Sequence, residues 1–95
     1  MKFEYDINKS VINKQKHGID FEEAKSIWQE TNVTLPAITR GEPRYMIIGR
    51  LRVNLYSCIF TIREEKIRII SCRINREKER KIYYEKIKEY GQQGI

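Results

Sequence analysis

The chain has 95 residues, which is enough for one folded domain and too few for a second. Its 40% hydrophobic and 34% charged residues are typical of a globular protein and exclude a disordered chain. The 19 Lys and Arg against 13 Asp and Glu give a net charge of +6, which either fits a polyanionic partner such as nucleic acid or keeps a small protein soluble.

The first third of the chain is predicted to form a short strand followed by two helices. Residues 3–6 have a strand pattern, and Asp6 can cap a helix that runs to about Lys16. Gly18 then supplies the left-handed turn that ends this helix. The apolar side of the helix is predicted to consist of Ile7, Val11 and Ile12.

The second helix is predicted over residues 19–30. Asp20 as N-cap and Glu23 three residues later approximate a capping box. Its buried face is defined by apolar residues at helical spacing, namely Phe21, Ala24, Ile27 and Trp28.

The middle of the chain is predicted to be a β-meander. Residues 32–38 form a weak edge strand, because Pro36 cannot donate to a ladder, and residues 40–43 form a turn. Three β-rich runs follow, at 44–51, 54–63 and 66–74. Their short connections predict antiparallel neighbours.

The last helix is predicted from Arg76 to Tyr90, with Asn75 as its cap. The fold class is therefore α+β, with the helices covering one face of a small antiparallel sheet. A single domain is expected over residues 1–91, with residues 92–95 as a C-terminal tail.

Two arginines in the strand at 66–74 are predicted to lie on opposite faces, because Arg68 and Arg73 are five residues apart. A three-residue turn before this strand would align the apolar side chains of strand 54–63 with the Arg68 face, and a two-residue turn would align them with the Arg73 face. The first register is preferred, because it buries Cys72 and Ile74 and leaves Arg73 on the open sheet surface.

Arginines on separate elements suggest a phosphate-binding surface, because guanidinium forks match phosphate oxygens and stay charged. Any one of them is more simply an ordinary solvated side chain. The hypothesis requires that Arg44, Arg73 and Arg80 gather around one anion-sized hollow. The full set of candidates is Arg44, Arg50, Arg52, Arg73, Arg76 and Arg80.

Three further residues have both a structural and a chemical interpretation. Glu79 lies on the apolar stripe of the last helix, which predicts an ion pair with Arg68 or Arg73, or alternatively a proton-carrying group. His17 is favoured as a charged residue at a helix C-terminus, with an acid–base role as the alternative. Tyr83 is expected in the core, and a base could stack on an exposed Tyr84.

Cys58 and Cys72 lie in strands without a CxxC motif or a nearby histidine, so no metal site is expected. Two buried thiols are favoured over a cross-strand disulfide. The mixed charges of "MKFEYDINK" predict no signal peptide, and the uncharged run at 53–62 is too short for a membrane span. A cytoplasmic protein without a membrane partner is expected.

The sequence resembles the BrnT toxins in three blocks. "FEYDINKSVINKQKHGIDFEEA" is similar to their F-x-W-D, K-x-x-x-N-x-x-K-H-G and F-x-E-A motifs. "EPRYMIIGR" is similar to their E-x-R strand, which leads to a glycine. "RIISCR" and the later Glu79, Arg80 and Tyr83 are similar to their R-I-I-S-A-R and E-R-x-x-Y.

This resemblance implies a RelE-like fold and a ribonuclease toxin of a type II toxin–antitoxin pair. Such toxins cleave RNA without a metal or other cofactor and thereby inhibit translation. The implied partners are an RNA substrate and a BrnA-like ribbon-helix-helix antitoxin, in a hetero-tetramer or higher complex that touches operator DNA only through the antitoxin.

The resemblance also implies roles for particular residues. Arg73 and Arg80 would grip the scissile phosphate, and Tyr83 would orient it. Glu79 or His17 would assist proton transfer. Further RNA contacts are expected from Arg44, Arg68 and Arg76. Two alternatives to a ribonuclease are a non-catalytic basic module that binds nucleic acid or an acidic partner, and a degenerate toxin that only binds its antitoxin.

Overall fold

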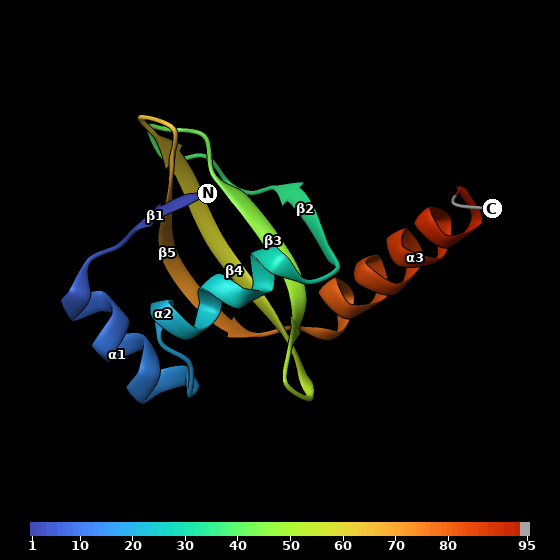
Figure 1. Cartoon of the computed structure of the whole chain (residues 1–95), viewed down its shortest axis with the longest axis horizontal. Helices are drawn as coiled ribbons and strands as arrows, with labels where there is room; N and C mark the ends of the chain where they lie inside the picture. Colours follow the sequence, from blue (N-terminus) through green and yellow to red (C-terminus); the bar gives the residue numbers. More distant parts are fainter. Residues whose placement is uncertain (94–95) are drawn as a thin grey trace.

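The computed structural model describes the backbone of residues 1–93 and the side chains of residues 1–89. Figure 1 shows one sheet with helices on both sides of it. In chain order the elements are β1 (Lys2–Glu4), α1 (Ile7–His17), α2 (Phe21–Ala24), the 3₁₀ helix η1 (Lys25–Gln29), β2 (Asn32–Pro36), β3 (Tyr45–Leu51), β4 (Asn54–Arg63), β5 (Lys66–Ile74) and α3 (Glu77–Gln93).

The sheet has the strand order β1-β5-β4-β3-β2. Strands β2 to β5 form the predicted antiparallel meander, and β2 lies at an edge as expected. However, β1 runs parallel to β5, with Phe3 opposite Ile67, so the prediction of an entirely antiparallel sheet is wrong. Only short turns force neighbouring strands to be antiparallel, and no turn joins β1 to β5. The α+β class is confirmed.

One sheet face, called the front face below, carries the main core under α1, α2 and η1. The predicted second helix consists of α2 and η1, and its capping box is confirmed. The Glu23 amide donates to Asp20 at 2.7 Å, and the Asp20 amide donates to Glu23 at 3.1 Å. The core residues are Ile19, Phe21, Ala24, Ile27, Ile47, Tyr56, Cys58, Phe60, Ile69 and Cys72.

The second helical segment lies very close to the sheet at Gly49 of β3. A Cβ atom at this position would lie 2.7 Å from Cγ2 of Ile27, whose side chain is fully buried. The absence of a side chain at Gly49 therefore sets how closely η1 packs on the sheet.

The opposite face, called the back face below, is partly covered by α3. Tyr83 packs there with Val33, Ile48 and Leu55 in a second core cluster. The prediction that helices cover only one face is therefore wrong. Because Ile47 and Ile48 are adjacent in β3 and point to opposite faces, β3 is apolar on both sides and needs cover on both.

The ends of α3 differ from the prediction. The helix reaches Gln93, beyond its predicted end at Tyr90, and residues 94–95 of the predicted tail lie outside the described residues. Asn75 does not cap the helix, because its side chain donates to the Arg76 carbonyl. Instead, the Glu79 carboxylate accepts from the Arg76 amide at 2.9 Å. Within residues 1–93, no helix is long and apolar enough to cross a membrane.

The buried side of α1 is polar, which contradicts the predicted apolar stripe. Ile7, Val11 and Ile12 are exposed, whereas Ser10 and Asn13 are buried. Past Arg68, β5 has no strand beside it on the β1 side, and the Asn13 amide takes that place. It donates to the Cys72 carbonyl at 2.8 Å and accepts from the Cys72 amide at 3.2 Å. Gly18 ends α1 with a φ of 75°, as predicted.

The register between β4 and β5 changes along their length. Near the hairpin, a two-residue turn places Arg63 opposite Lys66 and Phe60 opposite Ile69. A bulge then adds one residue to β5, so that Cys58 lies opposite Cys72. The preferred three-residue turn is therefore wrong, yet the burial of Cys72 that it predicted is confirmed.

The bulge also decides where the two arginines of β5 point. Arg68 lies opposite Thr61, and Arg73 lies opposite Ser57. Thr61 and Ser57 are four residues apart in β4 and share a face, so both arginines lie on the back face. The prediction of opposite faces is wrong, because an inserted residue reverses the alternation. Ile74, predicted in the core, is 51% exposed.

Candidate active site

A hollow of about 650 Å³ opens on the part of the back face that α3 leaves uncovered. The connection between β2 and β3 forms one wall, and the start of α3 forms another. Four arginines from three segments line it, Arg40 and Arg44 from the connection, Arg73 from β5 and Arg76 from the start of α3. The other lining residues are Pro36, Ala37, Ile38, Met46, Ile59, Ile70, Ser71 and Glu79.

The most extensively hydrogen-bonded group described in this site is the carboxylate of Glu79, a residue that is only 9% exposed. The guanidinium of Arg73 donates to both of its oxygens, at 2.8 and 2.7 Å. The Ser57 hydroxyl donates to it at 2.8 Å, and the Arg76 amide donates to it at 2.9 Å. The predicted ion pair is therefore confirmed, with Arg73 as the partner.

These contacts fix the charge of Glu79. Burial by itself raises the pKa of the carboxyl group, but hydrogen bonds from Arg73, the Arg76 amide and Ser57 outweigh it and lower the pKa from 4.5 to about 2. The hydrogen bonds to Glu79 also raise the pKa of Arg73. At neutral pH Glu79 is a charged anchor for Arg73 and not a reservoir for a proton.

The other three arginines of the hollow are not neutralised by a carboxylate. Among the side chains that the structure describes, Arg40, Arg44 and Arg76 make no ion pair. The Nε atom of Arg44 is also buried without a hydrogen-bond partner. A buried donor without a partner is uncommon and costly in a folded protein. The hollow is thus lined by three arginines without an ion pair among the described side chains, one of which also has a buried Nε atom without a partner.

Other arginines of the back face are neutralised nearby. Arg63 forms a two-bond pair with Glu42, at 2.9 and 2.7 Å, and lowers the pKa of that carboxyl group. Arg68, predicted to contact RNA, lies 3.8 Å from Glu4 and does not line the hollow. Arg63 and Arg68 therefore add no unpaired charge to the hollow.

Three predicted catalytic residues lie elsewhere. His17 is exposed at the end of α1, a helix that packs on the front face. Tyr83 is buried on the side of α3 that packs on the sheet, and its hydroxyl donates to the Thr31 carbonyl at 3.4 Å. Arg80 does not line the hollow, and its guanidinium lies 5.4 Å from the ring centre of Tyr84. The structure thus brings together Arg44, Arg73, Arg76 and Glu79 only.

The two cysteines are free and fully buried, which confirms the interpretation as buried thiols. They face each other across β4 and β5, and burial raises the pKa of Cys72 above its ordinary value. Within the described part of the chain, no three His, Cys, Asp or Glu side chains gather where they could hold a metal ion.

Arg40 and Ser71 were not predicted as site residues. Arg40 lies in a segment that has only a turn signal, and Ser71 reaches the back face only because of the bulge in β5. Only Arg40 could have been predicted from the sequence. It lies four residues before Arg44 in a short connection with a glycine and a proline, so the two arginines are close along the chain.

A small basic α+β domain with arginines around a hollow belongs to the class of proteins suited to hold a phosphate group. A family model of the ribonuclease toxin BrnT, of type II toxin–antitoxin systems, matches residues 5–79, and the chain belongs to this family. Membership implies an antitoxin partner. A comparison with curated proteins gave no match. The matched segment contains the whole arginine-lined hollow and ends before Arg80 and Tyr83.

Proposed function

We propose that this toxin cleaves RNA without a metal ion, with the scissile phosphate held in the arginine-lined hollow. The observation that carries the proposal is a hollow of about 650 Å³ with three arginines that form no ion pair with any carboxylate of residues 1–89. A phosphate is an anion that guanidinium groups match well, because two parallel N–H groups of the guanidinium can donate to two of its oxygens.

The proposed reaction is attack of a ribose 2′-hydroxyl on the adjacent phosphate, which forms a 2′,3′-cyclic phosphate and breaks the bond from phosphorus to the 5′-oxygen of the next nucleotide. Water takes the proton of the 2′-hydroxyl and supplies one to the leaving 5′-oxygen. Negative charge then grows on the phosphate oxygens in the transition state, and fixed positive charge stabilises it more than the ground state. Arg44 and Arg76 are proposed to contact these oxygens directly. Because guanidinium groups stay protonated at any working pH, they supply this charge without a metal.

Arg73 is proposed to contact the same phosphate with the N–H groups that Glu79 leaves unused. A guanidinium has five N–H donors; two of those of Arg73 are occupied by the carboxylate and one by the Ile74 carbonyl at 3.4 Å, which leaves two. Glu79 then acts as a positioning residue, since it holds the guanidinium in one orientation. A proton-transfer role for Glu79 or His17 is not part of this proposal.

The remaining features follow from the family resemblance and stay predictions. They are the RelE-like fold, inhibition of translation in the cytoplasm, and neutralisation by a BrnA-like ribbon-helix-helix antitoxin. A further prediction is that toxin and antitoxin form a hetero-tetramer or a higher complex, which contacts operator DNA only through the antitoxin.

The test is RNA cleavage by purified protein in an excess of chelator. Wild-type protein is expected to cleave, and Arg44→Gln is expected to lower the rate by about 10²- to 10³-fold, as for loss of one donor to a developing oxyanion. Arg52→Gln removes the same charge from the tip of the β3–β4 hairpin and should cleave like the wild type.

Two results would contradict the proposal. Cleavage that disappears with chelator and returns with a divalent metal would overturn the metal-free mechanism. Full activity of Arg44→Gln would remove the hollow from the reaction. RNA binding without any cleavage would favour the non-catalytic module instead.

A further inference from the structure

We propose that α3 carries a second RNA contact, formed by Arg80, Tyr84 and Arg50, which holds single-stranded nucleotides next to the scissile phosphate. We call these three residues the α3 track. The inference rests on the proposed function, because it takes the hollow as the place where the RNA strand is gripped.

The α3 track is an exposed tyrosine framed by two cations. The Arg80 guanidinium lies 5.4 Å from the centre of the Tyr84 ring. From the β3 side, Nη2 of Arg50 donates to the Tyr84 hydroxyl at 2.6 Å. The Tyr83 ring also packs against Tyr84 at 5.2 Å, yet Tyr84 remains 42% exposed, so these contacts orient the ring and cover only part of it.

The sequence spacing along α3 leads from the hollow to the track. Arg76 lines the hollow at the start of the helix, and Arg80 and Tyr84 follow it four and eight residues later. Residues four apart lie on the same side of a helix, at steps of about 6 Å along its axis. A strand that leaves the hollow along this side of α3 therefore meets Arg80 and then Tyr84.

Both arginines of the track contact Tyr84, and Arg50 also donates to the Val53 carbonyl at 3.2 Å. Among the described side chains, neither Arg50 nor Arg80 makes an ion pair, in contrast to Arg52 with Glu23 and Arg73 with Glu79. A purely structural link between α3 and β3 would need only the Arg50–Tyr84 hydrogen bond. An added unpaired arginine on an exposed aromatic ring is the combination that binds single-stranded nucleic acid by stacking and charge.

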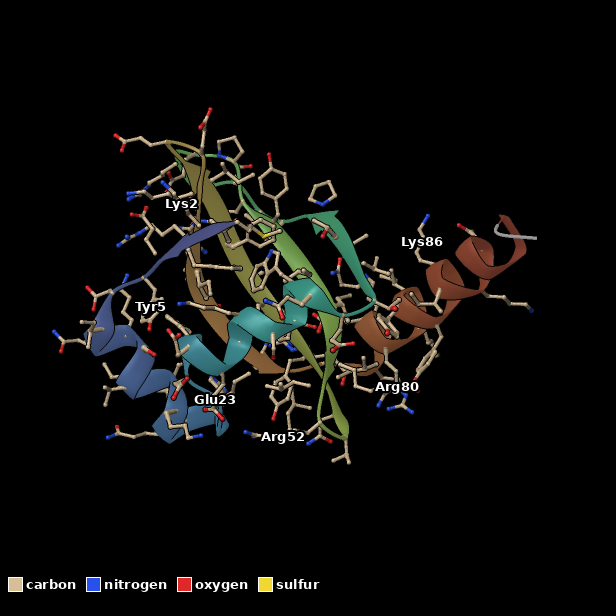
Figure 2. The ribbon with its side chains drawn as sticks, in the orientation of Figure 1. Lys2, Tyr5, Glu23, Arg52, Arg80 and Lys86 are labelled. Carbon is tan, nitrogen blue, oxygen red and sulfur yellow. The ribbon has the colours of Figure 1, made fainter. Side chains whose placement is uncertain are left out.

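Figure 2 shows that Arg80 lies on the lower side of α3, on the same side of the molecule as Arg52 near the tip of the β3–β4 hairpin. Lys86 lies on the upper side of the same helix. Lys86 therefore provides a control that removes a positive charge from α3 without touching the track.

The experiment measures binding of two RNAs with methylated 2′-hydroxyls, which cannot be cleaved. One is a dinucleotide that fills only the hollow, and the other is an octanucleotide that also extends along α3. Tyr84→Ala and Arg80→Gln should each weaken octanucleotide binding by about 10-fold and leave dinucleotide binding unchanged. Arg80→Gln should also reduce the salt dependence of log K by about 0.7.

Two variants separate stacking from a structural link. Tyr84→Phe loses the hydrogen bond to Arg50 but keeps the ring, so octanucleotide binding should stay within about twofold of wild type. Lys86→Gln should bind both RNAs like the wild type. Circular dichroism and urea unfolding of each variant establish that the fold is retained.

Octanucleotide binding that is unchanged in both Tyr84→Ala and Arg80→Gln would overturn the α3 track and leave the proposed function standing. Equal losses for both RNAs would also overturn it, because the residues would then act at the hollow. Arg44→Gln should weaken both RNAs. An Arg44→Gln variant with normal binding of both would instead contradict the proposed function, whatever the track variants do.

Discussion

Arg73 of β5 and Glu79 of α3 form a two-bond ion pair, with N···O distances of 2.8 and 2.7 Å, at the edge of the arginine-lined hollow. The pair joins the end of the central hairpin to the first turn of the last helix. It therefore has two roles at once, because it anchors α3 to the sheet and sets the direction of a guanidinium in the site.

Replacing Arg73 by alanine is expected to lower the free energy of unfolding by about 1–3 kcal/mol, because it leaves a buried carboxylate without its main partner. Urea unfolding measures this change. Arg44→Gln, in the same hollow but without an ion pair, should change stability by less than about 0.5 kcal/mol. Equal stability of Arg73→Ala and wild type would show that the pair does not hold α3.

Stability should fall in acid because of Glu79. Its pKa is about 2 in the folded protein and about 4.5 in the unfolded chain, so the unfolded state binds the proton first. The stabilisation is fully present above about pH 5 and is lost as the pH falls toward 2. Glu79→Gln should therefore differ most from wild type at pH 7 and least near pH 2 in thermal unfolding. A difference that stays constant over this range would contradict the assignment.

Asn13 is expected to be essential for the free edge of β5. Asn13→Ala removes a donor and an acceptor from the Cys72 backbone and should destabilise the protein by about 1–3 kcal/mol. Hydrogen exchange of the Cys72 amide should accelerate more than that of the sheet centre. Gln15→Ala, on the exposed side of α1, is the matched control and should leave both measurements unchanged.

Substitutions in the turn between β4 and β5 are expected to raise the stability of the protein. Glu64 and Glu65 have φ values of 50° and 65°, a left-handed conformation that favours Asn and Gly. The double change Glu64→Asn and Glu65→Gly should raise the free energy of unfolding by about 1 kcal/mol or more. Glu85→Gly, inside α3, should have the opposite effect of about 1 kcal/mol. A loss of stability in the turn variant would argue against the two-residue register.

Both thiols should be inert in the folded protein. Cys58 and Cys72 are 0% exposed, and burial raises the pKa of Cys72, so little thiolate forms. A thiol reagent should label them only as fast as the protein unfolds, and quickly in denaturant. Rapid labelling under native conditions would show that the sheet opens between β4 and β5.

Local signals in the sequence were sufficient for several features. The capping box of Asp20 and Glu23, the left-handed Gly18 and the β2–β5 meander each depend on residues that are close in the chain. The Glu79 ion pair was predictable because a carboxylate on an apolar stripe needs a cation. Which arginine supplies it was left open, because Arg68 and Arg73 are both near in sequence.

Long-range pairing decided the rest. Nothing local indicates that β1 lies parallel to β5, or that Asn13 completes the edge of β5 and so turns the polar side of α1 inward. A turn of two glutamates that carries no Asn or Gly signal reversed the predicted faces of the first half of β5, and one inserted residue restored them at Cys72 and Arg73. The pattern of a strand indicates which of its side chains share a face. Which of the two faces is buried depends on the register with the neighbouring strand. The sequence by itself thus determined that arginines lie in these strands and in the first turn of α3, and only the tertiary structure decided which of them share one hollow.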